Sequence, residues 1–266
     1  MIVRHRATGE VLLEVPGDSL VGARLPNAVL FSGDLRGLDL SDADLSGADL
    51  CATDLRGARF DRARLTGADL SGSDLSGASF REASLADAKL LGVDLSDTDL
   101  CGADLTRAAF RLAHAQAQAP ARLRDARLTR SNLTRASMPG SDLTGADLSE
   151  ITAIGTNLSH SQMRGASLSA AHLLDVDLSG ASLEHADLTL ATLHRVRLAG
   201  TMLAGALLGS TVFAMCPELP LALGLDALSH VGPSSLDVVT LREMAERLPE
   251  EFLRGVGHPV EHDAGH

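Results

Sequence analysis

A large apolar residue recurs at every fifth position through most of this chain of 266 residues. The first run extends from Leu20 to Phe110, and 16 of its 19 positions are Leu while the other three are Phe. The second run extends from Leu123 to Phe213, and 15 of its 19 positions are Leu. A period of five matches neither the α-helix, with about 3.6 residues per turn, nor the β-strand, with a repeat of about two. The chain must therefore change direction regularly, once in each five-residue unit.

A second column of mostly small residues accompanies the large ones, two positions before each of them. Within one unit, for example, Ala68 precedes Leu70. A large residue at Ile151 stands beside Ala153, the one small residue in the large column, so this pair conserves volume as a close-packed core requires. If the chain turns a corner in every unit, each corner points one large and one small residue inward. Representative core positions predicted in this way are Leu45, Leu75, Leu95, Leu143 and Leu178.

Units such as SGADL (46–50), TGADL (66–70) and CGADL (101–105) match the A(D/N)LXX signature of the pentapeptide-repeat family. The chain resembles this family from about residue 18 to residue 213, over two runs of 19 units, or 38 units in all. The resemblance implies an all-β fold, a right-handed quadrilateral β-helix with four units in each coil. Nine and a half coils, with strands about 4.8 Å apart, would form a rod about 45 Å long.

The repeat is interrupted between Phe110 and Leu123, where the spacing equals two units plus three extra positions. We predict a loop at 114–120 that separates a first repeat run, 18–113, from a second, 121–215. The loop is either a tolerated surface insertion or a contact loop. The resemblance implies that, in relatives that act on topoisomerases, loops that leave the solenoid take part in the contact with the topoisomerase. The contact residues would be His114, Gln116 and Gln118.

Both ends of a solenoid expose an unpaired strand edge and an open core, so each end needs a cap. At residues 1–17 we predict a short β-hairpin. At residues 216–266 we predict a helical cap and tail, with a capping box from Ser234 to Asp237 and a helix that ends before Pro249. The apolar face of this helix would consist of Val238, Leu241, Ala245 and Leu248. The helix either covers the last coil or joins a second copy into a homodimer.

The C-terminal segment also carries a second resemblance. Residues 230–257 are similar to a connector that follows pentapeptide repeats in some multidomain bacterial proteins. In those proteins the connector precedes a signalling effector such as a TIR-type domain. This resemblance implies a role in a bacterial defence or signalling system.

Asp is concentrated immediately before the central Leu of the unit. With four units in each coil, Asp residues that lie four units apart at this position stack on one face as an acidic ladder. The main ladder consists of Asp34, Asp54, Asp74 and Asp94, and a shorter ladder on another face consists of Asp49 and Asp69. Asp side chains commonly accept hydrogen bonds from the backbone in turns, which explains part of this preference. The ladder is also a regular negative track that resembles the phosphate backbone of duplex DNA.

The net charge of the chain is −12 at pH 7. Residues 216–266 contribute −6, from nine acidic and three basic side chains, and the rest of the chain contributes −6, from 26 acidic and 20 basic side chains. The rod itself is therefore only mildly acidic. A protein that binds nucleic acid directly carries a basic patch or stripe, which this sequence lacks. We expect no direct nucleic-acid binding.

The sequence contains no phosphate-binding loop, no nucleophile motif and no pair of carboxylates suited to catalysis. Its three cysteines are too few and too widely spaced for a disulfide framework or a zinc site. His258, His262 and His266 have the spacing of a metal cluster, but Pro259 and Gly265 disfavour a helix, so we expect a frayed tail. We therefore predict a non-catalytic protein without a cofactor or metal. The lack of a signal peptide and of a long apolar segment predicts a cytoplasmic location away from membranes.

Two functions fit these features. In the first, the acidic ladder mimics DNA, binds a type II topoisomerase (DNA gyrase or topoisomerase IV) and protects it from a poison, which would give antibiotic resistance. In the second, the rod is a scaffold or sensor module of a bacterial defence or signalling system and captures its partner through residues 230–257. The resemblance to the family supports the first function, and the connector supports the second. A partner unrelated to either also stays open.

Overall fold

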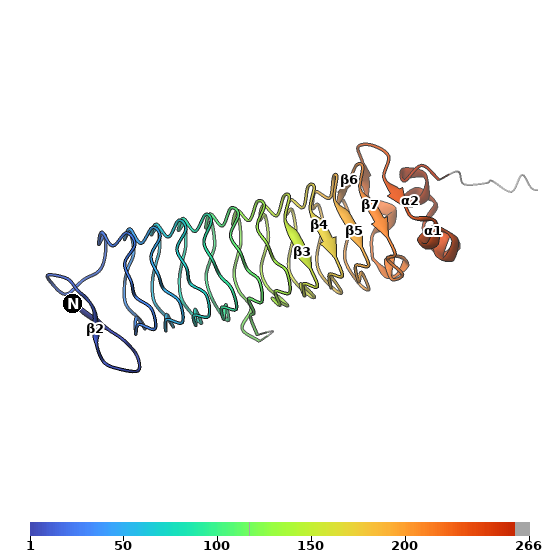
Figure 1. The fold of residues 1–266 in the computed structure, drawn as a ribbon. Coiled ribbons are helices and arrows are strands. Elements are labelled where there is room, and N and C mark those ends of the chain that lie inside the picture. The colour runs from blue at the N-terminus through green and yellow to red at the C-terminus, as the bar shows by residue number, and fades with distance from the viewer. Residues whose placement is uncertain (117, 259–266) are drawn as a thin grey trace, which may run out of the picture.

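The computed structural model describes residues 1–116 and 118–258, except for the side chain of Glu243. Its coils stack into a straight rod, with a hairpin at the N-terminal end and short helices at the C-terminal end (Figure 1). Parallel β-bridges join equivalent positions of successive coils, for example Asp34 to Asp54. The prediction of an all-β, right-handed, four-sided β-helix is confirmed.

Most corners of the coils are hydrogen-bonded β-turns, and the corners that follow β-strands in the C-terminal half are bends, so the chain turns once in every five residues. The carbonyl of the large residue accepts a hydrogen bond from the N–H of the small residue three positions later, as in the 3.1 Å bond from Ala43 to Leu40. The residue before the small one has a positive φ, as the third position of a type II turn requires. In the described chain 38 corner residues have this conformation, of which 22 are not Gly and 16 are Gly (20 Gly with positive φ, less four outside the repeats). The Gly of the SGADL and TGADL units is therefore a third repeating signal.

The core is a continuous column of large and small side chains along the axis of the rod. The representative positions Leu45, Leu75, Leu95 and Leu178 are 0% exposed, and Leu143 is 1% exposed. Ile151 and Ala153 are both buried, so the pair with exchanged volumes does lie in the core. Phe60 and Phe80 lie one coil apart and stack, with ring centroids 4.7 Å apart. The interior is therefore closely packed from one coil to the next.

Ser and Thr replace Ala at several positions of the small column, and most of their hydroxyl groups find a recurring partner. Thr53 Oγ1 donates to the carbonyl of Leu30 at 3.0 Å, and Thr156 Oγ1 donates to the carbonyl of Leu133 at 2.8 Å. In both cases the acceptor lies in the neighbouring coil. By contrast, the buried hydroxyl group of Ser131 has no hydrogen-bond partner among the described residues.

Substitution of these hydroxyl residues by Ala is expected to have opposite effects on stability. Thr156→Ala removes a buried hydrogen bond, so the free energy of unfolding should fall by about 0.5–1.5 kcal/mol. Ser131→Ala removes a buried polar group without a partner, so the free energy of unfolding should rise by about 1 kcal/mol. Chemical denaturation followed by circular dichroism measures both changes. A loss of stability in Ser131→Ala would mean that its hydroxyl group is in fact satisfied.

The N-terminal cap is a β-hairpin formed by β1 (Ile2–Arg4) and β2 (Val11–Glu14), which pair antiparallel. β1 lies against the first coil, because the N–H of Asp34 donates to the carbonyl of Arg4 at 3.0 Å. The side chain of Val3 is buried in this contact. The hairpin, which lies where the sequence predicts it, therefore closes one side of the first coil.

On one side of the C-terminal half, the coils form a regular parallel sheet with the order β3-β4-β5-β7-β9. Its strands are β3 (Thr152–Ile154), β4 (His172–Leu174), β5 (Thr192–His194), β7 (Val212–Ala214) and β9 (Ser235–Leu236). On the adjoining side, β6 (Leu207–Leu208) pairs with β8 (Ser229–His230). The solenoid therefore continues beyond residue 215, the predicted end of the second run, because the backbone of β8 and β9 still pairs with the preceding coil.

Short helices lie at the C-terminal end, and the last of them cover the final coil. They are the 3₁₀-helices η1 (Leu219–Leu221), η2 (Leu225–Ala227) and η3 (Ala245–Arg247) and the α-helices α1 (Val238–Met244) and α2 (Glu250–Gly255). Phe252 on α2 is fully buried and packs edge-on against Phe213, with ring centroids 6.0 Å apart. Leu248 and Leu253 are also buried. The C-terminal helices therefore form a cap.

Two details of the predicted C-terminal helix are wrong. The N-cap of α1 is Asp237 rather than Ser234, because Asp237 accepts hydrogen bonds from the N–H groups two and three positions later. Ser234 instead lies in the solenoid, immediately before β9. The helix ends at Met244 and does not continue to Leu248, since a 3₁₀ turn follows it. Val238, which was expected on the apolar face, is 69% exposed.

The insertion is shorter than the predicted loop at 114–120. Ala113 is buried in the small column, and His114 forms parallel bridges to Asp94 and to the following coil. Ala115 is 6% exposed and takes the place of the large residue. His114 therefore belongs to the solenoid, and the chain leaves the solenoid only after Ala115. Because Ala fills both inward positions, a search for large residues overlooks this unit.

Candidate protein-binding face

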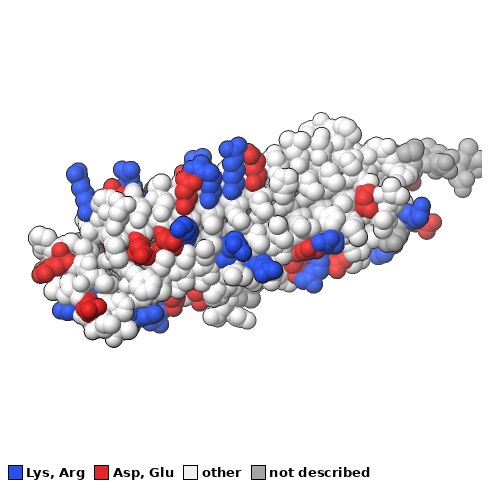
Figure 2. Space-filling model, in the orientation of Figure 1, with Lys and Arg blue, Asp and Glu red and all other residues white. Residues whose placement is uncertain are grey.

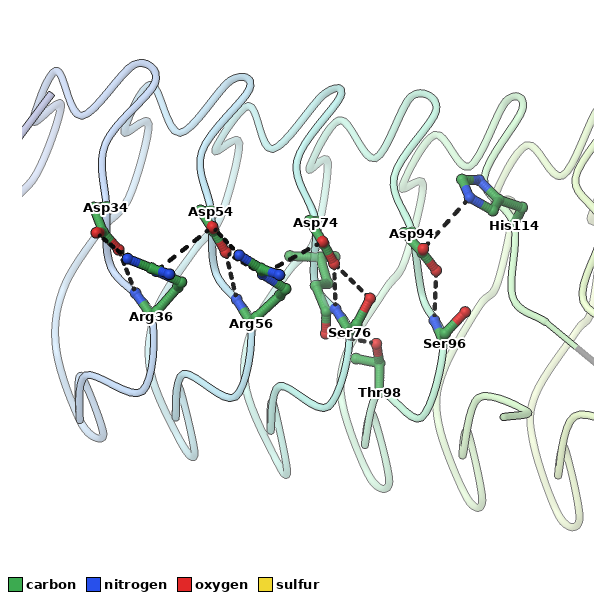
Figure 3. Close-up of polar contacts among 11 residues, drawn as sticks. Asp34, Arg36, Asp54, Arg56, Asp74, Ser76, Asp94, Ser96, Thr98 and His114 are labelled. Atoms are coloured by element: carbon green, nitrogen blue, oxygen red, sulfur yellow. Dashed lines mark hydrogen bonds and ion pairs between the residues drawn. The ribbon is translucent and has the colours of Figure 1, made fainter. Parts of the chain in front are cut away.

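The main acidic ladder forms one column on a single face of the N-terminal half. Its members Asp34, Asp54, Asp74 and Asp94 lie one per coil and are joined by successive parallel bridges. Figure 3 shows the four carboxylates in a row along the rod, followed by His114 in the next coil. The Nε2 atom of His114 lies 3.6 Å from Oδ2 of Asp94. The structure thus brings together all four residues of the main ladder.

The ladder carboxylates also hold the turns that follow them. The N–H two positions later donates to Oδ1 of the Asp, at 3.0 Å from Ser76 to Asp74 and at 2.9 Å from Ser96 to Asp94. The carboxylates of the shorter ladder accept the same bond. This is the local hydrogen bond by which Asp stabilises turns. A structural role therefore explains why Asp occupies this position in so many units.

Two arginines neutralise part of the main ladder. Arg36 donates two hydrogen bonds to Asp34, at 2.8 and 2.7 Å, and Arg56 donates two to Asp54 at the same distances. Each guanidinium also lies 3.6 Å from a carboxylate of the next coil, that of Asp54 for Arg36 and that of Asp74 for Arg56. Four carboxylates and two guanidinium groups give the column a charge of −2 instead of −4. Charges alternate from Asp34 to Asp74, whereas Asp94 follows Asp74 without a cation between them, so the column is not a continuous negative track.

Accessibility and ionisation also differ along the main ladder. The side chain of Asp54 is 5% exposed, compared with 37% for Asp34 and 39% for Asp74. Hydrogen bonds from Arg36 and Arg56 lower the pKa values of Asp34 and Asp54, respectively. Asp54 is therefore held ionised by its arginine but offers little surface to a partner.

The shorter ladder ends at a lysine. Asp49 is bridged to Asp69, and Lys89 follows in the next coil with its Nζ atom 3.1 Å from Oδ2 of Asp69. Burial opposes the ionisation of Asp69, but hydrogen bonds, the strongest from Ser71, outweigh burial and lower the pKa of Asp69 to about 2. This ladder is therefore also partly neutralised.

The rod is expected to lose stability as the pH falls from about 4 to about 2. Asp54 and Asp69 have lower pKa values in the folded state than the ordinary value of 3.8. Their contribution is complete above the unfolded-state pKa and disappears as the pH falls through the folded-state pKa, which is about 2 for Asp69. Thermal unfolding over this range measures the effect, and Asp69→Asn should show a shallower dependence. A melting temperature that is constant over this range would contradict the prediction.

The insertion lies directly after the main ladder. The N–H of Gln116 donates to Ser96 Oγ at 3.1 Å, and the carbonyl of Ala119 accepts a hydrogen bond from the N–H of Asp97 at 2.8 Å. The side chains of Gln116 and Gln118 are exposed. The main ladder and the loop after Ala115 are therefore neighbours on the surface of the rod. The candidate face consists of Asp34, Arg36, Asp54, Arg56, Asp74, Asp94, His114, Gln116 and Gln118.

The described residues offer little for catalysis. Among them, no group of three or more His, Cys, Asp or Glu side chains is placed to hold a metal ion, and His262 and His266 lie outside the described chain. A surface hollow of about 360 Å³ is lined in part by Cys101 and Arg124. Burial, together with Asp99, raises the pKa of the Cys101 thiol and so disfavours a nucleophilic thiolate there. No helix in the described part of the chain has the length and apolarity needed to cross a bilayer.

Sequence reasoning overlooked the basic partners of the ladders, although a signal for them exists. Arg36 and Arg56 each follow a ladder Asp by two positions, in two Asp-Leu-Arg motifs that lie four units apart. Lys89 likewise lies four units after Asp69. The coil length of four units therefore places all three basic side chains beside the acidic ladders.

The family model for pentapeptide repeats matches the chain in eight copies, which together extend over residues 19–114 and 121–209. This chain belongs to the pentapeptide-repeat family. The gap between the two matched stretches coincides with the insertion. Proteins of this family are generally structural or interaction proteins rather than enzymes. A search among curated proteins finds no match.

Several solved pentapeptide-repeat structures are similar to this protein. HetL from the cyanobacterium Nostoc, which is involved in the regulation of heterocyst differentiation, is 33% identical with a TM-score of 0.71, and the match covers 73% of this chain and 86% of HetL. A pentapeptide repeat protein from the thylakoid lumen of Arabidopsis thaliana is 29% identical with a TM-score of 0.31, over 44% of this chain and 68% of its own. QnrB1, a plasmid-mediated fluoroquinolone resistance protein, is 24% identical with a TM-score of 0.33, over 68% of this chain and 90% of its own. Of these three, HetL superposes well.

Proposed function

We propose that this pentapeptide-repeat protein is a non-catalytic regulatory scaffold that binds a protein partner through its candidate face. The observation that carries the proposal is the similarity to HetL, which is involved in the regulation of heterocyst differentiation. A stack of coils holds side chains at fixed positions along a rod. The surface of the rod is therefore already ordered before a partner binds, and the rod loses little conformational entropy on binding.

The candidate face is the binding surface in this proposal because its charges are regular and pre-organised. Arg36 and Arg56 are each held by two hydrogen bonds to a carboxylate, which fixes the planes of both guanidinium groups. A fixed order of positive and negative charges selects a partner with the complementary order and repels others. The connector at 230–257, which the sequence suggested for partner capture, supports this role less well, because Phe252 and Leu253 are buried in the cap.

Replacement of both arginines of the candidate face tests the proposal. We expect the Arg36→Gln and Arg56→Gln double variant to retain the fold and to bind the partner about tenfold or more weakly, because charged hydrogen bonds contribute about 1.5–3 kcal/mol each. The full-length protein and its variants would be used to capture partners from the source cells, with quantification by mass spectrometry. The matched control is Arg62→Gln with Arg107→Gln, since these arginines also donate two hydrogen bonds each to one carboxylate, that of Asp42 or Asp87 in the neighbouring coil, and lie outside the candidate face. Equal capture of the same proteins by both double variants would contradict the proposal.

A DNA mimic that protects DNA gyrase or topoisomerase IV is the second candidate function. The observation in its favour is the row of four ladder carboxylates, one per coil. Arg36 and Arg56 weaken it, because a duplex presents phosphates of a single sign. Both candidates require the cytoplasmic location that the sequence predicts.

A supercoiling assay separates the two candidates. Purified gyrase would be treated with a fluoroquinolone in the presence of the protein, of a variant with Asp74→Lys and Asp94→Lys, or of the control Asp104→Lys on another face. Protection that only the ladder variant loses would favour the DNA mimic. No protection at saturating protein would exclude it and leave the regulatory scaffold.

A further inference from the structure

One wall of the C-terminal half carries no Asp, Glu, Lys or Arg. It consists of the outward residues of β3, β4, β5 and β7 and of the corners that precede β4, β5, β7 and β9. The strand residues are Thr152, Ile154, His172, Leu174, Thr192, His194, Val212 and Ala214, and the corner residues are Ser169, Ala170, Thr189, Leu190, Gly209, Ser210, Val231 and Gly232. Together they form the uncharged wall. Figure 2 shows a broad area over these strands without acidic or basic side chains, whereas charged side chains are frequent on the N-terminal half.

The uncharged wall exposes apolar side chains that the fold does not need there. Leu190 is 59% exposed, Val231 is 66% exposed and Ile154 is 39% exposed. Leu190 also has a φ of 60°, a conformation that is unfavourable for a bulky residue and that Gly or Asp would adopt more easily. This conformation recurs at all 38 corners of the repeats, so the backbone does not distinguish Leu190. Three large apolar side chains exposed together on an uncharged surface do point to a role in binding. The wall has an uncharged centre, and the ion pair between Asp175 and Arg195 lies at its rim, as in many protein interfaces.

The shape of the wall favours one kind of partner. Its strands pair in one continuous register, Thr152 to His172 to Thr192 to Val212. Figure 1 shows the arrows of β3, β4, β5 and β7 nearly parallel. In ordinary sheets adjacent strands rotate by about 20–25°, so the sheet of a globular partner would diverge from this flat wall within a few strands. A second copy of the same wall matches its flatness over the whole length.

The net charge of the chain also favours a second copy of this protein as the partner of the wall. The chain carries −12, so two copies repel each other wherever acidic surfaces meet. The uncharged wall is a surface through which two copies can approach without bringing like charges together. We propose that the protein forms a homodimer in which two copies pack their uncharged walls face to face. This dimer is distinct from a dimer through the C-terminal helix, and it leaves the candidate face of each copy open to a different partner.

The size of the wall sets the strength of this dimer. The wall has fewer residues on each side than the roughly 20–30 of a standard interface, so we expect a weak dimer with a dissociation constant on the order of 10 µM. Sedimentation velocity with the full chain, from about 1 to 300 µM, should show a sedimentation coefficient that rises from the monomer value to the dimer value. Salt should strengthen the dimer slightly, because it screens the repulsion between the acidic chains. A monomer at every concentration would overturn the proposal and would leave the wall to a different protein or to none.

Charged variants locate the interface. Leu190→Asp should raise the dimer dissociation constant about tenfold or more, because each copy would bury an unpaired carboxylate, while Asp tolerates the positive φ and so preserves the fold. The matched control is Leu112→Asp, since Leu112 is 56% exposed, has a φ of 60° and lies outside the wall. Thr192→Arg, at the centre of the wall, should also weaken the dimer. If Leu190→Asp and Thr192→Arg leave the dimer intact while Val239→Asp on α1 disrupts it, the interface lies at the C-terminal cap and the proposal is wrong.

Discussion

Leu75→Ala is expected to lower the free energy of unfolding by about 2–5 kcal/mol. Leu75 is 0% exposed, and its backbone is held on both sides, since its N–H donates to the carbonyl of Asp94 and its carbonyl accepts from the N–H of Ala78. The coil therefore cannot collapse around a smaller side chain. The cavity and the loss of buried apolar area both destabilise the folded state. Chemical denaturation followed by circular dichroism measures the change.

The control for this substitution is Leu112→Ala. Leu112 is 56% exposed at a corner, so its truncation removes little buried area and should change the free energy of unfolding by about 0.5 kcal/mol or less. Because coils contact only their neighbours, the damage from Leu75→Ala should be greatest in the adjoining coils, which hydrogen exchange can resolve. Equal stability of the two variants would mean that the large column does not form the core.

Ala68→Leu is expected to lower the free energy of unfolding by about 1–3 kcal/mol or more. Ala68 is 0% exposed, and its carbonyl accepts a hydrogen bond from the N–H of Lys89 at 2.9 Å, which fixes the distance to the next coil. The interior is too narrow for two large residues at one corner. The additional methyl and methylene groups must therefore displace the backbone or force strained rotamers. Thermal unfolding measures this effect, and the melting temperature of Ala68→Leu should be lower than that of the unchanged protein.

Ala86→Leu is the matched control for overpacking, because Ala86 precedes a corner residue on the outward side and is only partly buried. A leucine there has room, so its effect should lie within about 0.5 kcal/mol. If Ala68→Leu were as stable as this control, the interior would have spare volume and the requirement for a small column would be wrong. Together with Leu75→Ala, this comparison tests both columns of the repeat.

The sequence by itself determined the solenoid, its inward residues and the presence of a cap at each end. The determinant is the period of five, since only a chain that turns once per unit can keep both Leu75 and Ala68 inside. Every unit has the same local geometry, so one deviation, such as Ile151 beside Ala153, does not hide the five-residue period of the sequence. The positive φ at each corner follows the same period, and Gly marks it at 16 of the 38 corners.

Only the tertiary structure decided how the surface is organised. Arg36 bridges Asp34 and Asp54, and Lys89 pairs with Asp69, through side-chain conformations that span neighbouring coils. The sequence period places such residues on one face but does not set which carboxylate each cation binds. Pairing with a neighbouring coil likewise decided that Asp237 is the N-cap of α1 and that His114 belongs to the solenoid. A local repeat specifies what points inward, because packing inside is the same at every corner, whereas contacts between coils specify what the outside presents to a partner.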